Sequence, residues 1–118
     1  VVTTDPNCIF CQIVAEKLPA NVLHRDEHVM AFQSIQPVAA THIIVIPTEH
    51  VEFIVDCDES QAPLIGRLAL AASQIAERGG LDATGYRLTI NQGPDADQSV
   101  DHLHMHLLGG EQLGGMVS

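Results

Sequence analysis

The sequence is poor in basic residues, in aromatic residues and in long apolar runs. Five of its 118 residues are Lys or Arg against 15 Asp or Glu, which gives a formal net charge of −10 with His neutral. So acidic a chain is poorly suited to neutralise many backbone phosphates, and we expect no nucleic-acid partner. No apolar run approaches the about 18 residues of a membrane-spanning helix, so we expect no membrane partner.

Cysteine is scarce as well, and the count is odd. Three cysteines, Cys8, Cys11 and Cys57, do not suit the disulfide framework of a small secreted protein. The first residues, VVTTDPNC, lack the basic and apolar parts of a signal peptide. We therefore expect a cytoplasmic protein. With 46% hydrophobic and 17% charged residues, residues 1–118 are expected to form a single globular domain.

Apolar spacing and turn residues predict an α+β fold with a mainly antiparallel sheet. A short N-terminal helix is expected within residues 7–18. One long helix should begin at a capping box of Asp58 and Gln61 and end at Gly79 and Gly80. Extended segments are expected at residues 21–28, 29–32, 41–47, 86–91 and 102–108.

Histidine is unusually frequent, and three of the seven lie in the segment HLHMHLL, residues 102–108. Residues two apart on a strand share a face and lie about 6.6 Å apart. The segment therefore divides into an apolar face of Leu103, Met105 and Leu107 and an imidazole face of His102, His104 and His106. Buried imidazoles need polar partners, so three in a row indicate chemistry. Nucleophilic catalysis is one use, and metal binding by the row itself, which this spacing suits less well, is the other.

HLHMHLL resembles the histidine-triad (HIT) signature, in which histidines alternate with apolar residues. The blocks CIFCQIVAEKLPANVL, MAFQSIQP, THIIVIPTEHV, GYRLTINQG and QSVDHLHMHLLGG resemble the Hint-like nucleoside phosphoramidase branch. Together the blocks cover about residues 7–115. The resemblance implies a homodimeric α+β fold that binds a purine nucleotide beside its last strand.

The resemblance also implies an activity, the hydrolysis of purine nucleoside 5′-phosphoramidates of the AMP-amine or aminoacyl-AMP type. His104 would attack the α-phosphorus, and water would release the nucleoside monophosphate from the resulting nucleotidyl-histidine. No cofactor is required for this chemistry. The matching positions imply that His102 and His106 orient and polarise the reacting groups. They also imply that His42, Gln98 and Ser99 lie near the phosphate or leaving group and that Asn91 neighbours the phosphate or ribose. The base pocket would be lined by Phe10, Phe32 and Ile35.

Two other functions stay open. One is a dinucleoside polyphosphate hydrolase, although QSV before the histidines and Gly-Gly after them favour the phosphoramidase. The other is a non-catalytic, nucleotide-binding regulatory dimer. Three departures from the family pattern bear on the choice: Ser34 stands where an Asp usually binds the ribose hydroxyls, Asp97 where a Gly is typical, and Glu111 where an Arg is usual. Ser34 predicts weaker selection of the ribose, since a hydroxyl cannot make the bidentate, charge-assisted contact.

Cys8 and Cys11 form a C-x-x-C pair that has three interpretations: a redox dithiol, half of a metal site, or two small buried residues. No strand and βαβ unit accompany the pair, as a thioredoxin-like motif would require. A tetrahedral zinc site needs two more ligands, for which His50 and His102 are the candidates. Some members of the histidine-triad superfamily carry zinc on a matching set, so the resemblance implies a structural zinc that fixes His102.

Overall fold

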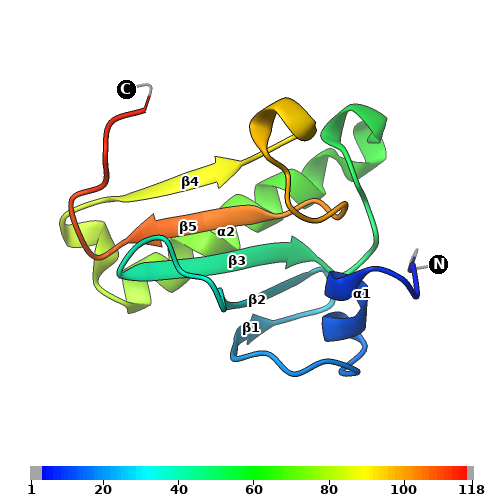
Figure 1. The fold of residues 1–118 in the computed structure, drawn as a ribbon, viewed down its shortest axis with the longest axis horizontal. Helices are drawn as coiled ribbons and strands as arrows, with labels where there is room; N and C mark the ends of the chain where they lie inside the picture. The colour runs from blue at the N-terminus through cyan, green and yellow to red at the C-terminus, as the bar shows by residue number, and fades with distance from the viewer. Residues whose placement is uncertain (1–3, 117–118) are drawn as a thin grey trace.

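A computed structural model describes residues 4–116 of the chain (Figure 1). Within these residues, one sheet has five strands in the order β1-β2-β3-β5-β4, and every neighbouring pair is antiparallel. The strands are β1 Val22–Arg25, β2 Val29–Gln33, β3 Thr41–Pro47, β4 Tyr86–Ile90 and β5 Met105–Gly109. The long helix α2, Ala62–Arg78, packs on one face, and the short helix α1, Ile9–Val14, packs on the other. The predicted α+β class is confirmed.

Strand β3 lies at the centre of the sheet because its apolar run IIVI can be buried on both faces. Ile43 and Val45 belong to the core beneath α2, whereas Ile44 and Ile46 lie on the side of α1. Adjacent residues thus serve two separate cores. The sheet thereby holds α1 on the face opposite α2, and the candidate site forms around α1.

Helix α2 begins and is buried as its sequence predicts. Asp58 and Gln61 form the expected capping box, on a short 3-10 turn that leads directly into the helix. The helix ends before Gly79, and Gly80 adopts a φ of 76°, a conformation that glycine allows without strain. The apolar residues Leu64, Leu68, Ala72, Ile75 and Ala76, which follow one another at helical spacing, are buried. No helix in residues 4–116 combines the length and apolarity needed to cross a membrane.

Three element boundaries differ from the prediction by more than one residue. Strand β1 ends at Arg25 rather than at residue 28, because the carboxylate of Asp26 accepts the backbone N–H groups of His28 and Val29 and turns the chain there. Helix α1 ends at Val14 rather than near residue 18, and Glu16, with a φ of 62°, turns the chain away well before Pro19. Strand β5 begins at Met105 rather than at residue 102. The backbone N–H groups of His102 and Leu103 donate to loop carbonyls instead of joining a ladder. The predicted alternation nevertheless holds, with its apolar face buried at Leu103, Met105 and Leu107.

Candidate functional site

The site forms where α1, the end of β3 and the segment leading into β5 meet. Ring centroids lie 5.1 Å apart for His50 and His102, 5.0 Å for His104 and His106, and 5.1 Å for His106 and His42. Phe10 of α1 packs edge-on against His104 at 5.2 Å. The predicted triad is therefore present as a cluster of imidazoles, although only His106 lies on β5 itself.

His104 is held in one tautomer by a main-chain hydrogen bond. Its Nδ1–H donates to the carbonyl of His102 over 2.7 Å, and because a carbonyl can only accept, Nε2 keeps the lone pair. The residue is 1% exposed. Residues 4–116 offer Nε2 no hydrogen-bond partner, so its lone pair is not used within the described chain. Burial lowers the pKa of His104, which keeps the ring neutral and Nε2 nucleophilic at pH 7.

His42 and His106 form a second chain with a defined direction. The backbone N–H of Val38 donates to Nδ1 of His42 over 3.1 Å, so the proton of His42 lies on Nε2. That Nε2–H donates to Nδ1 of His106 over 2.8 Å. The remaining nitrogen of His106, Nε2, must then carry its own proton. Burial lowers the pKa of His42, and it lowers the pKa of His106 to about 4, so both rings are neutral donors.

A cavity of about 500 Å³ opens beside these histidines. Its walls, drawn from the described residues, include no charged side chain and are mainly apolar. Seven predicted site residues line it: Phe10, Phe32, Ser34, Ile35, His42, Ser99 and His106. The Ser34 hydroxyl accepts the backbone N–H of Gln36 over 3.2 Å and keeps its own hydrogen to donate.

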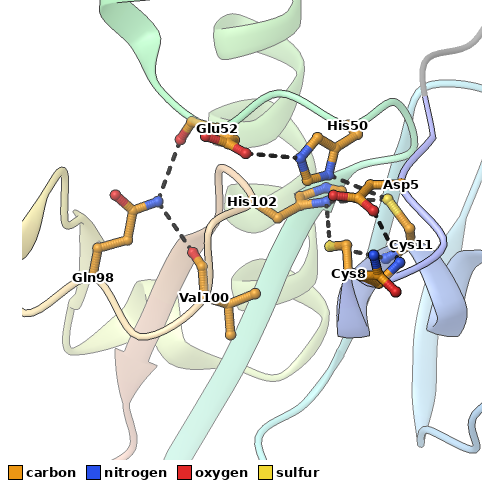
Figure 2. Close-up of polar contacts among 9 residues, drawn as sticks. Asp5, Cys8, Cys11, His50, Glu52, Gln98, Val100 and His102 are labelled. Atoms are coloured by element: carbon orange, nitrogen blue, oxygen red, sulfur yellow. Dashed lines mark hydrogen bonds and ion pairs between the residues drawn. The ribbon is translucent and has the colours of Figure 1, made fainter.

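Three predicted nucleotide-binding residues, Asn91, Gln98 and His104, do not line this cavity. Asn91 lies just beyond the end of β4. Gln98 is committed to main-chain groups. Its amide oxygen accepts the N–H of Gly93 over 2.8 Å, and its amide nitrogen donates to the carbonyls of Val100 over 3.1 Å and of Glu52 over 3.3 Å. Figure 2 shows the contacts to Val100 and Glu52. The role of Gln98 in this structure is therefore to shape the loop that carries Ser99. The departures Asp97 and Glu111 are exposed and also lie outside the lining.

Several contributors to the site were not predicted. Ile9 and Ile13 of α1 line the cavity together with Ile44 and Val100. The spacing of Ile9 and Ile13 indicates one helix face, which could have suggested that they share a surface with Phe10. Main-chain partners such as the N–H of Val38 leave no trace in the side-chain pattern.

Cys8, Cys11, His50 and His102 converge as the candidate metal centre (Figure 2). Their ligand atoms all lie within 4.8 Å of one another. Sγ to Nδ1 distances are 3.3 Å for Cys8 and His102, 3.3 Å for Cys11 and His50, and 3.7 Å for Cys11 and His102. A tetrahedral zinc with Zn–S and Zn–N bonds of usual length has S to N edges of about 3.6 Å. The side chains as placed therefore fit a zinc ion.

The surroundings of these ligands also fit a metal. Nε2–H of His102 donates to the carbonyl of Pro47 over 3.0 Å, which leaves its Nδ1 lone pair facing the thiols. Nε2 of His50 lies 3.4 Å from Oε1 of Glu52, the carboxylate partner that metal-bound histidines commonly have. Burial raises the pKa of Cys11 to about 11, so a metal must displace the thiol proton.

Comparison with known proteins places the chain among HIT-domain proteins. The HIT domain model matches residues 15–113. The purine nucleoside phosphoramidase of Escherichia coli (strain K12) is 38% identical over 110 residues, which cover 93% of this chain and 92% of that protein. A 14 kDa zinc-binding protein of Zea mays is 40% identical over 111 residues, covering 92% and 86%. The solved structure of a HIT family hydrolase from Clostridium thermocellum superposes with a TM-score of 0.93 at 40% identity, covering 98% and 100%. The chain therefore belongs to the HIT domain family, as the HLHMHLL segment predicts.

Proposed function

We propose that the protein hydrolyses the P–N bond of purine nucleoside 5′-phosphoramidates, of the AMP-amine or aminoacyl-AMP type. The observation that carries the proposal is the 2.7 Å hydrogen bond from Nδ1–H of His104 to the carbonyl of His102, which leaves Nε2 as a neutral nucleophile. The 38% identity to a purine nucleoside phosphoramidase supports the choice of substrate.

In the proposed reaction, Nε2 of His104 attacks the α-phosphorus and the P–N bond breaks. The leaving nitrogen takes up a proton and departs as an amine. Water then attacks the nucleotidyl-histidine, the N–P bond breaks, and the nucleoside monophosphate leaves. Over both steps, water supplies a hydroxyl to phosphorus and a hydrogen to the amine, and His104 returns to its neutral form.

Neutral donors take the place of Lys or Arg in this scheme. Nε2–H of His106 faces away from His42 and would donate to a phosphoryl oxygen, which stabilises the charge that develops in the transition state. The hydroxyl of Ser99, at the same cavity, is the candidate donor on the leaving-group side. Phe10, Phe32 and Ile35 would contact the purine, and Ser34 the sugar.

We also propose that the metal centre binds zinc. Two thiolates and two imidazoles are the donors that zinc prefers in structural sites. Four protein ligands leave no open position, so zinc would supply a cross-link between chain segments and no catalytic chemistry. The zinc-binding relative from Zea mays supports the metal assignment.

A homodimer and a cytoplasmic location complete the proposal. Strand β4 is an edge of the sheet with half-buried residues throughout, and it pairs within the described chain only with β5. An edge of this kind can pair with a second copy. All three cysteines are unpaired thiols, which suits a reducing compartment.

One observation favours a different function, a non-catalytic nucleotide-binding dimer. His104 is 1% exposed and does not line the cavity, so the nucleophile has little access to a bound ligand. Turnover of a fluorogenic AMP-amine, compared with diadenosine polyphosphates and with AMP binding, distinguishes the three functions. We expect P–N hydrolysis that His104→Ala abolishes while AMP binding persists. AMP binding without any turnover would support the regulatory function instead.

A further inference from the structure

The metal centre and the cavity share helix α1. Cys8 caps the helix, with its Sγ accepting the backbone N–H of Cys11 over 3.4 Å, and Cys11 lies within it. Both cysteines belong to the ligand set. Between them lie Ile9 and Phe10, which line the cavity. Two of the four ligands thus bracket part of the cavity wall.

Phe10 connects this helix to the nucleophile. Its ring meets His104 edge-on at 5.2 Å and Phe32 at 5.6 Å. It is 6% exposed, so it packs in the core of the α1 side while still facing the cavity. A displacement of α1 would therefore move the cavity wall and free the ring of His104 together.

Helix α1 has little stability of its own, since a six-residue helix cannot form alone in water. Its position depends on tertiary contacts. Apart from apolar packing, one contact is the hydrogen bond from Arg25 to the carbonyl of Val14, over 2.7 Å. The others run from Cys8 and Cys11 to the imidazoles of the metal centre.

His102 connects the centre to the nucleophile by a second route. Its Nδ1 faces the thiols, its Nε2–H binds the carbonyl of Pro47, and its own carbonyl receives Nδ1–H of His104. A ligand that fixes the His102 ring also fixes the peptide group that sets the tautomer of His104.

We infer that Cys8, Cys11 and His50 are positioning residues for the active site: by holding a zinc with His102, they clamp α1 so that Phe10 and the His102 carbonyl keep His104 in its nucleophilic orientation. The kinetic part of this inference rests on the proposed function, but the placement of α1 and His104 does not. Loss of the ion should therefore perturb His104 selectively, beyond a general loss of stability.

The test uses His50, which lies outside both α1 and the cavity and, unlike His102, makes no hydrogen bond to His104. Its side chain is 11% exposed. His50→Ala removes one ligand, and His50→Cys restores a donor that zinc accepts. His28→Ala is the matched control, because the His28 side chain is 45% exposed and lies outside the metal centre. Zinc per chain, amide hydrogen exchange, the ring ¹⁵N signals of His104 and the kinetics of AMP-amine hydrolysis are measured on each protein.

We expect His50→Ala to lose zinc, to exchange the amides of α1 at least about tenfold faster with α2 unchanged, and to populate both tautomers of His104. The kcat for AMP-amine should fall and KM rise, by about tenfold together in kcat/KM. His50→Cys should restore all four readouts, and His28→Ala should match the wild type.

A zinc-free His50→Ala protein with a protected α1 and a single His104 tautomer would overturn the inference, as would a wild type that binds no zinc. Equal acceleration in α1 and α2 would also overturn it, because it would show global destabilisation. If His50→Ala does not fold, chelation and zinc re-addition on the wild type give the same readouts. A wild type that does not hydrolyse AMP-amine would contradict the proposed function. Amide exchange in α1 and the ring ¹⁵N signals of His104 would still show whether zinc holds the helix and the ring in place.

Discussion

The hydrogen bond between His42 and His106 gives the most specific prediction about the imidazole cluster. His42→Ala removes the Nε2–H that donates to Nδ1 of His106 over 2.8 Å and the acceptor for the backbone N–H of Val38. Without that donor, the proton of His106 can lie on either ring nitrogen. The Nδ1–H tautomer then points a lone pair, instead of a proton, at the phosphoryl group.

The magnitude follows from the two hydrogen bonds. A net contribution of about 1 to 1.5 kcal/mol from the bond to His106 corresponds to roughly a five- to thirteenfold preference for the Nε2–H tautomer. Without that preference the two tautomers are about equally populated, so kcat/KM should fall by about twofold. Leaving Nδ1 of His106 unpaired in a buried site should lower the free energy of unfolding by about 1–3 kcal/mol.

The assay compares His42→Ala with His42→Gln in AMP-amine hydrolysis and in urea unfolding. The Gln amide can place an N–H near the position of Nε2 and so keep the donor to His106, while the acceptor for Val38 is lost. We expect Gln to recover most of the activity and only part of the stability. A His42→Ala enzyme with full activity, or a Gln variant as impaired as Ala, would refute the directed hydrogen-bond chain.

Three further predictions follow. Burial lowers the pKa of His42 and lowers that of His106 to about 4, so between about pH 6.5 and 4 the unfolded chain binds more protons than the folded one. The free energy of unfolding should therefore be full above this window and fall as pH drops through it, by up to about 1.4 kcal/mol per pH unit for each group. Urea midpoints that stay level from about pH 7.5 to 5 would contradict this. Ser34→Asp should increase the preference for ribo- over 2′-deoxyribo-substrates in kcat/KM, because a carboxylate can accept both sugar hydroxyls; an unchanged ratio would remove Ser34 from the sugar site. Leu68→Ala, at a fully buried position of α2, should lower the free energy of unfolding by about 2–5 kcal/mol and leave KM unchanged. A loss below about 1 kcal/mol, which is typical of surface substitutions, would place Leu68 outside the core.

Much of the fold could be predicted because local patterns and tertiary burial agree. The capping box at Asp58 and the apolar stripe after it define α2, and the run IIVI defines the central strand. Two of the boundaries that failed, at Glu16 and at Met105, depend on turn conformation and on loop carbonyls that compete for backbone donors. Such competition is decided by tertiary structure and not by residue type.

The candidate site, too, was predictable from the sequence only in part. The ligand set of Cys8, Cys11, His50 and His102 was predicted from residue types and resemblance, and the structure brings all four together. The orientation of His104 could not be predicted, since it depends on a main-chain carbonyl. Nor could the sequence show that its ring is almost wholly covered.

The central claim is that Nε2 of His104 forms a covalent bond to phosphorus, and trapping that intermediate tests it most directly. The wild type is mixed with an AMP-amine, quenched within the first turnover, digested, and mapped by mass spectrometry under conditions that preserve phosphoramidate bonds. The account predicts a nucleotidyl adduct on His104 that appears and decays at rates compatible with kcat and is absent from His104→Ala. Turnover with the adduct on another histidine, or undiminished hydrolysis by His104→Ala, would contradict it.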